Sequence, residues 1–201
     1  ERFHTPGHVA WVQKKSAEGH GTIDYGDTPA CPDIYAAAAT VVGSALHGLD
    51  TIMSGDAQRT FQPIGGLHHA RRDRAAGFCV FNDVAIATRV LQREGAVRRV
   101  LVVDLDVHQG DGTAWIAADD PSIFTFSLHG RANFPFRKAN SDLDVEFADD
   151  TGDAAYLSTL AVALPCALAA ARPQLAIYLA GADPFTTTEL AGAGVDIVLY
   201  C

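Results

Sequence analysis

Acidic side chains and a histidine follow an apolar run near the middle of the chain. Asp104, Asp106, His108 and Asp111 come directly after Val100–Val103, a run of β-branched and aliphatic residues. An uninterrupted run of this kind is typical of a strand buried on both faces of a parallel sheet. In an extended chain Asp106 and His108 leave the same face, and a carboxylate with an imidazole is half of a zinc site. A solvated loop with a capping aspartate is the alternative for this stretch alone.

A second apolar run also ends in an acidic residue. Leu175–Ala180 leads into Gly-Ala-Asp, which places Asp183 just after a predicted strand. Ligands of parallel sheets bind at the carboxyl ends of the strands. Asp183 would therefore join Asp106 and His108 around one metal and leave a coordination position open, as in hydrolytic zinc sites. A helix N-cap is the ordinary alternative for Asp183.

Two adjacent histidines precede the central strand. His68 and His69 follow Gly65 and Gly66, so we expect them in a loop, where they would supply a general base or acid. Nearby carboxylates would accept hydrogen bonds from these imidazoles and fix their tautomers and basicity. Histidines in a glycine loop are also found as simple turn residues.

The spacing of apolar, glycine and proline residues predicts the elements that carry these groups. Strands are expected at 100–103, 123–128 and 175–180, and helices at 9–17, 33–53, 83–94 and 154–171. Strands alternating with helices through short joins indicate a parallel α/β sheet. We expect Pro165 to begin a new helix rather than lie inside one, and 130–153 to be a polar loop.

Composition limits the class of protein. The 201 residues are enough for one domain, and 48% hydrophobic with 19% charged residues is typical of a soluble globular chain. A net charge of −9 argues against nucleic acid as a direct partner. Four scattered cysteines predict neither a zinc finger nor a disulfide framework, which favours a reducing compartment, the cytoplasm. The longest apolar stretch, Leu160–Ala171, is too short to cross a bilayer, so we expect no membrane partner.

Two motifs resemble those of the histone deacetylase superfamily, which includes acetoin-utilisation proteins and bacterial amidohydrolases. They are Gly65–Asp83 and Val103–Gly112, and the resemblance runs from about His4 to Phe185. Gln109 is similar to the class IV branch, whereas Gly65–Asp83 is closer to bacterial acetylpolyamine and acetoin-type proteins, which leaves the subfamily open. The resemblance implies a three-layer αβα fold of arginase/deacetylase type with a mainly parallel central sheet. It would be incomplete at both ends, with 1–201 as one partial domain.

The resemblance also implies two ion sites. Asp106, His108 and Asp183 would hold Zn2+, with Fe2+ as the alternative because a histidine–carboxylate set accepts both. A structural K+ would be bound by carbonyl groups of Asp104, Asp106, His108, Ser127 and Leu128.

Catalytic and substrate-binding roles follow from the same resemblance. His69 would be the proton shuttle and His68 its partner, tuned by Asp104, while Asp111 would orient His69. A narrow tunnel for an acetylated amine would be lined by Gly77, Phe78 and Phe134, with Asp27 holding the substrate backbone.

The function expected from these residues is zinc-dependent hydrolytic deacetylation of acetyl-lysine or an acetylpolyamine. After Asp183 the chain departs from the family pattern, and the family's glycine-rich loop with a catalytic tyrosine would lie beyond Cys201. The tail at Asp196–Tyr200 is expected as an apolar strand or a non-native end, and the chain, starting at Glu1, as an excised piece. A truncated, catalytically impaired metal-binding or interaction protein of the same fold is therefore the alternative. A two-metal hydrolase of the arginase type fits the tandem histidines less well, and the oligomeric state stays open.

Overall fold

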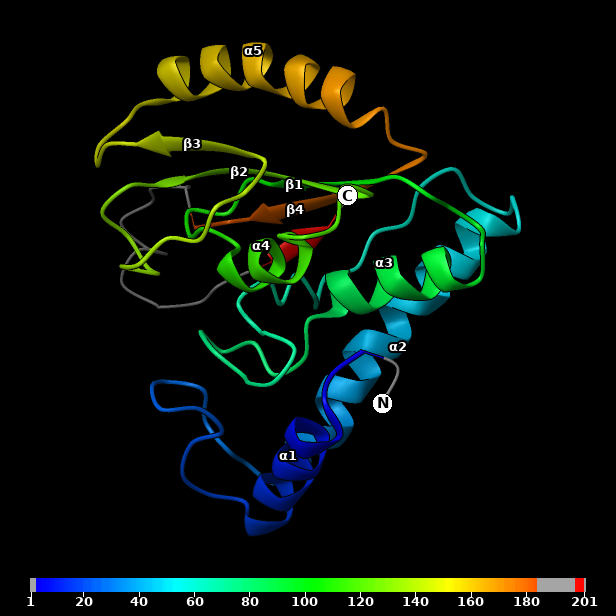
Figure 1. Ribbon diagram of the computed structural model, residues 1–201. Helices are drawn as coiled ribbons and strands as arrows, with labels where there is room; N and C mark the ends of the chain where they lie inside the picture. The colour runs from blue at the N-terminus through cyan, green and yellow to red at the C-terminus, as the bar shows by residue number, and fades with distance from the viewer. Residues whose placement is uncertain (1–2, 184–197, 201) are drawn as a thin grey trace.

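Short apolar runs form the strands of one sheet, and longer amphipathic or alanine-rich segments form helices around it (Figure 1). The computed structural model describes residues 3–183 and 198–200. Its elements, in chain order, are α1 (Pro6–Glu18), α2 (Ile34–Met53), α3 (Asp83–Arg93), β1 (Val100–Asp104), α4 (Asp111–Ala117), β2 (Ile123–Gly130), β3 (Leu143–Phe147), α5 (Asp153–Ala171), β4 (Leu175–Gly181) and β5 (Val198–Tyr200).

The described strands lie in the order β3-β2-β1-β4-β5. β1 pairs in parallel with β2 on one side and β4 on the other, and β3 is parallel to β2. β5 pairs antiparallel with the end of β4. The predicted α/β fold with a mainly parallel sheet is confirmed, and the carboxyl ends of β1 and β4 lie side by side.

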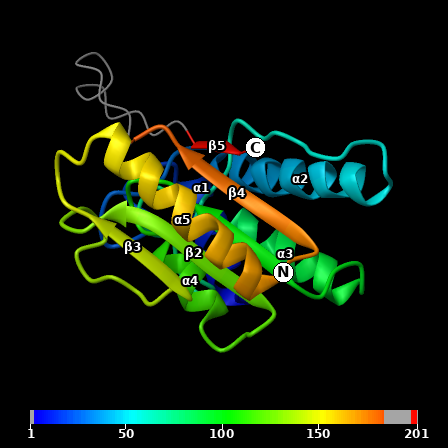
Figure 2. The ribbon, with the colours of Figure 1, turned by 90° about the horizontal axis from the view of Figure 1, so that it is seen from above.

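Helices cover both faces of the sheet and make three layers. Figures 1 and 2 show α5 crossing one face above β1 and β2, while α3 and α4 lie on the other. Successive side chains of a strand point to opposite faces, and β1 is buried on both. Leu101 and Val103 pack towards α5, whereas Val100 and Val102 pack towards α3.

Local capping residues explain the ends of the predicted helices. Asn82 caps α3 by accepting a hydrogen bond from the Ala85 N–H at 2.9 Å. Thr5 caps α1 by accepting one from the His8 N–H at 3.2 Å, and Gly19 ends the helix with a φ of 71°. Both helices were expected from the sequence, α1 with a shorter span.

Two local predictions were wrong, and one short helix was missed. The predicted polar loop at 130–153 contains β3, and the short helix α4 was not foreseen. Pro165 does not begin a new helix but lies inside α5. An internal proline costs about 3 kcal/mol in a helix, and the packing of Leu164 and Ala167 against the sheet offsets this cost.

Two helices, α2 and α5, are long and apolar enough to cross a membrane by length and composition. The expectation that no apolar segment reaches this length is thus wrong for α5, which continues through Pro165 for 19 residues. Both helices pack on other elements of the fold, α2 on α1 and α3, and α5 on β1 and β2. Core helices of soluble proteins reach the same length and apolarity when they are mostly buried, whereas 11% of the apolar segment of α2 and 6% of that of α5 are buried here. The absence of a membrane partner stays a prediction.

Candidate active site

Three residues that could hold a metal ion come together where β1 and β4 end. One ligand atom each from Asp106, His108 and Asp183 lies within 4.8 Å of the other two. The Nδ1 atom of His108 is 3.0 Å from an oxygen of Asp106 and 2.9 Å from Oδ2 of Asp183. The two strand ends therefore bring together residues that are 77 positions apart, from Asp106 to Asp183.

The sequence argument for this meeting was wrong in one detail. β1 ends at Asp104, so Asp106 and His108 are not successive same-face residues of an extended strand. They lie in a bend, in which the His108 N–H donates a hydrogen bond of 2.7 Å to Oδ1 of Asp106. This local bond between backbone and side chain turns the chain so that the imidazole and the carboxylate face each other.

The arrangement depends on a glycine at the end of β4. A Cβ atom on Gly181 would lie 1.9 Å from Oδ2 of Asp106, far inside van der Waals contact. Only glycine lets the backbone of β4 approach this carboxylate so closely. The Gly-Ala-Asp sequence contains this signal, but its meaning depends on a contact between distant parts of the chain.

The charges of the cluster fit a divalent cation. Asp183 Oδ2 is buried and, apart from its contact with His108, has no hydrogen-bond partner in the described part of the chain. Burial lowers the pKa of His108, but the Asp106 and Asp183 carboxylates outweigh it and raise the pKa to about 10. A site that attracts positive charge this strongly and offers two carboxylates and one imidazole suits Zn2+ or Fe2+.

His68 pairs with Asp104, the last residue of β1. Its Nδ1 lies 2.7 Å from Oδ2 of Asp104, and both side chains are buried. Burial lowers the pKa of His68, but the Asp104 carboxylate dominates and raises it to about 9. A charged imidazole is therefore favoured at this position at neutral pH.

His69 pairs with Asp111, the first residue of α4. Its Nδ1 lies 2.7 Å from Oδ1 of Asp111, and Oδ2 of the same carboxylate accepts a hydrogen bond of 2.9 Å from Arg71. Burial and the neighbouring charge of His68 lower the pKa of His69 to about 4. The two rings are 4.2 Å apart between centroids, so one charged and one neutral imidazole lie side by side.

Asp83, the first residue of α3, anchors the loop that carries the histidines. Its carboxylate accepts hydrogen bonds from the N–H groups of Gly66 at 3.3 Å and Leu67 at 2.9 Å. The carbonyl of His68 accepts a further bond from the Thr113 N–H at 2.9 Å. The sequence pattern showed Asp83 only as a helix residue, and neither its role nor that of Arg71 was predicted.

Three of the four predicted substrate residues line one cavity. Asp27, Gly77 and Phe134 lie on the wall of a cavity of about 650 Å3. The ring of Phe134 is 4.9 Å from that of His69, and a Cβ atom on Gly77 would lie 2.6 Å from the His69 ring. Phe78 is not on the lining, but it is adjacent to Gly77 and 56% exposed.

Two of the five residues predicted to bind a monovalent cation line a common cavity. Asp104 and Ser127 are register partners on β1 and β2 and line a cavity of about 10 Å3, the size of one small ion or water. Asp106, His108 and Leu128 do not line it.

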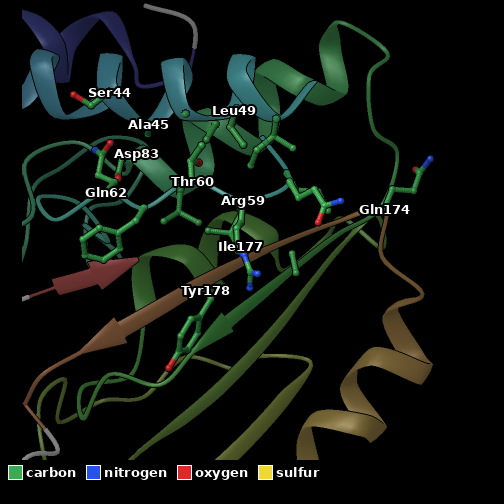
Figure 3. Close-up of a pocket in the computed structure, with 18 residues that line it drawn as sticks. Ser44, Ala45, Leu49, Arg59, Thr60, Gln62, Asp83, Gln174, Ile177 and Tyr178 are labelled. Carbon is green, nitrogen blue, oxygen red and sulfur yellow. The ribbon is translucent and has the colours of Figure 1, made fainter. Parts of the chain in front are cut away.

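A separate cavity of about 390 Å3 lies between α2, the segment 58–62 and the first half of β4 (Figure 3). Asp83 and Tyr178 are on its wall, as are Leu49 and Ile177. None of the candidate metal ligands or tandem histidines lines it. It lies beside the start of β4, whereas the candidate site lies at the strand's end.

Comparison with known proteins identifies relatives of this chain. A family model described as the histone deacetylase domain matches residues 1–201. An uncharacterized protein of Picosynechococcus is 51% identical over 119 residues, 59% of this chain and 40% of that protein. The acetoin utilization protein AcuC of Staphylococcus aureus is 35% identical over 158 residues, 73% of this chain and 40% of that protein. AcuC of Bacillus subtilis is 42% identical over 111 residues, 54% of this chain and 28% of that protein.

A solved structure agrees in fold. The crystal structure of the HDA15 HD domain superposes with a TM-score of 0.78 at 30% identity, covering 91% of this chain and 57% of that one. The matches to the three curated relatives extend over 28 to 40% of their lengths.

Proposed function

Because the chain belongs to the histone deacetylase family, we propose that it carries the metal-binding and proton-transfer residues of a hydrolytic deacetylase. The substrate would be an acetylated amine, either acetyl-lysine or an acetylpolyamine. One observation supports this most directly. Three candidate ligands meet beside two histidines, and each histidine is paired with its own buried carboxylate at 2.7 Å.

Asp106, His108 and Asp183 would hold the metal. A divalent ion, Zn2+ or else Fe2+, polarises an amide carbonyl and lowers the pKa of water. The negative charge of the two carboxylates supports this assignment, as does the buried Oδ2 of Asp183, whose one contact in the described part of the chain is His108.

His69 is the proposed general base and then acid. Its lowered pKa keeps it neutral, and Asp111 occupies its Nδ1, which leaves Nε2 to take a proton from the attacking water. The same Nε2 then returns the proton to the leaving amine as the amide bond breaks. Asp111 favours one tautomer and orients the ring, as a carboxylate behind a catalytic histidine does.

His68 is proposed to act through its charge. The Asp104 carboxylate keeps it protonated, so its positive ring lies beside the reacting atoms without taking part as a base. A fixed positive charge stabilises the oxyanion that develops when water attacks the carbonyl. The two histidines thus have different roles because their environments shift their pKa values in opposite directions.

The cavity next to Phe134 is the proposed entrance for the substrate. Asp27, Gly77 and Phe134 line it, and Phe78 is adjacent to Gly77, so an apolar acyl-amine chain would pass the phenylalanine rings towards His69. A K+ ion held by backbone carbonyls near Asp104 and Ser127 would have a structural role. We also propose a cytoplasmic location, on the cysteine pattern alone.

The test is amine release from two substrates by zinc-loaded protein. An acetyl-lysine peptide and an acetylated polyamine are each incubated with the protein, and free amine is measured with and without a hydroxamate inhibitor. We expect release that the inhibitor blocks, and a 10²–10⁴-fold loss in His69→Ala with zinc still bound. Zinc binding without hydrolysis of either substrate would instead support a metal-binding or interaction protein. Full activity in His69→Ala would refute the role of this residue.

A further inference from the structure

Arginines gather around a fourth cavity, on the side of the chain where α3 and α4 lie together (Figure 1). Its volume is about 790 Å3. Five of its nine lining residues are arginine, although the chain as a whole carries a net charge of −9. We call it the arginine pocket; it is lined by Phe3, Arg71, Arg72, Asp73, Arg74, Arg89, Arg93, Trp115 and Ile116.

We propose that the arginine pocket binds a small molecule that carries two or more adjacent anionic groups, such as a diphosphate. The pocket is of the size usual for small-molecule sites. Guanidinium groups bind phosphate through pairs of parallel hydrogen bonds, which favours arginine over lysine at such places. The proposal does not depend on deacetylase activity.

Two of the arginines have no partner for their charge among the residues that the structure describes. The side chains of Arg72 and Arg93 make no hydrogen bond or ion pair within residues 3–183 and 198–200. Both are exposed on the wall of the pocket. Their hydrogen-bond donors are therefore available to a ligand, and two separate guanidinium groups match two anionic groups better than one.

The other three arginines are already held in place by carboxylates. Arg71 donates to Asp111, Arg74 is paired with Asp73, and Arg89 with Asp120. Each guanidinium has five donors, so these pairs leave N–H groups free. The pairs restrain these side chains, but the carboxylates offset much of their charge, so the net positive charge of the pocket comes mainly from Arg72 and Arg93.

The backbone that carries Arg71, Arg72 and Arg74 is also rigid. The Arg71 N–H donates to the Arg74 carbonyl at 2.9 Å and closes a tight turn. The Arg72 carbonyl accepts bonds from the Thr5 N–H at 3.0 Å and from His4 Nδ1 at 3.2 Å. From α3, Arg89 and Arg93 also line the pocket; they are four residues apart and share one face of the helix. A preorganised site loses less conformational entropy on binding.

Trp115 reports on the pocket. The Arg71 guanidinium lies 5.2 Å from the centre of its ring, and the indole is 55% exposed. The chain has one other tryptophan, Trp11, which lines the substrate-side cavity instead. In a Trp11→Phe background, the fluorescence of Trp115 follows the arginine pocket alone.

The test is a titration with pyrophosphate in which binding is measured by calorimetry and by the fluorescence of Trp115. Because pyrophosphate binds metals, the protein is first treated with a chelator, and the titration is repeated on zinc-loaded protein. We expect saturable binding that weakens as salt is raised. Arg72→Ala and Arg93→Ala should each weaken it about tenfold, and the double variant about 100-fold.

Arg98→Ala is the matched control, because Arg98 is exposed and does not line the pocket. It should leave the dissociation constant within about twofold, as expected for a distant surface charge in salt. Three results overturn the proposal: no saturable binding of pyrophosphate, an equal loss in Arg98→Ala, or orthophosphate binding as tightly as pyrophosphate. Circular dichroism of each variant checks that the fold is kept, which the exposed positions lead us to expect.

Discussion

Gly181 lies so close to Asp106 that a single methyl group would overlap the carboxylate, with a Cβ atom 1.9 Å from Oδ2. Asp106 is buried and has little room to move away. The packing of the β4 backbone thus sets the position of one proposed ligand, although Gly181 itself offers the metal no ligand atom.

Gly181→Ala should weaken zinc binding while the sheet still forms. The added methyl would rotate Asp106 away from His108 and Asp183, and loss of a ligand's supporting contact typically costs about 10–100-fold in metal affinity. Competition with a chromophoric chelator measures the affinity. Gly43→Ala in α2, where a Cβ meets nothing within 4 Å, is the control and should leave it unchanged. Equal zinc affinities in the two variants would show that the close approach of Gly181 to Asp106 does not affect zinc binding.

Zinc should stabilise the folded chain through Asp183. Binding to the native state alone adds about 2.7 kcal/mol to the free energy of unfolding when free zinc is 100 times its dissociation constant. Asp183→Asn keeps the shape but loses the charge, so its stability should respond far less to the same zinc concentration. Thermal unfolding with and without zinc gives the comparison. Asp149→Asn, an exposed position, should behave like the unaltered chain; a full zinc response in Asp183→Asn would contradict the ligand assignment.

Asp83→Ala should destabilise the chain by about 1–3 kcal/mol, because it leaves the Gly66 and Leu67 N–H groups without their acceptor. Urea unfolding measures the change. We also expect faster hydrogen exchange of these two amides, since the loop that carries the histidines is no longer anchored to α3. Asp119→Ala, at an exposed position, is the control. A variant with unchanged exchange at both amides would show that the loop is held by other contacts.

Stability should fall in mild acid, in part because of His4. This side chain is 5% exposed, accepts a bond from the Asn82 N–H, and has a pKa lowered from 6.5 to about 4 by burial and by His8. The unfolded chain then binds more protons than the folded one between these values. Stability is full above pH 6.5 and is lost as the pH falls towards 4, by at most about 3 kcal/mol from this group.

Urea unfolding between pH 4 and 7 checks this dependence. His4→Gln should make the curve shallower, because His4 no longer titrates while His69 still does, whereas His20→Gln, which removes an exposed histidine, should leave the slope unchanged. An unaltered slope in His4→Gln would assign the acid sensitivity to other groups.

The central part of the fold could be predicted because its signals are local. β1 is buried on both faces and therefore consists of an apolar run, and Asn82 caps α3 through its own side chain. β3 was missed although Asp144 and Glu146 alternate with apolar residues as in a strand with one exposed face, because this edge strand is only five residues long and lies within a polar segment.

The positions of the site residues were predicted better than the contacts that support them. Asp106, His108 and Asp183 could be expected to meet because they follow neighbouring strands. The dependence of Asp106 on Gly181, and of His69 on Arg71 through Asp111, arises from contacts between segments far apart in the chain. No spacing pattern contains that information, because a glycine or an arginine in a loop has many ordinary explanations.

Arg71 has a single guanidinium group with two neighbours, Asp111 on the inside and the arginine pocket on the outside. An anion in that pocket would bind the remaining N–H groups of the same guanidinium and draw its charge away from Asp111, and so change how firmly the carboxylate holds His69. Linkage of this kind is reciprocal. A stronger ion pair between Asp111 and Arg71 would weaken anion binding by an equal free energy. The arginine pocket and His69 would then be thermodynamically coupled through one guanidinium group.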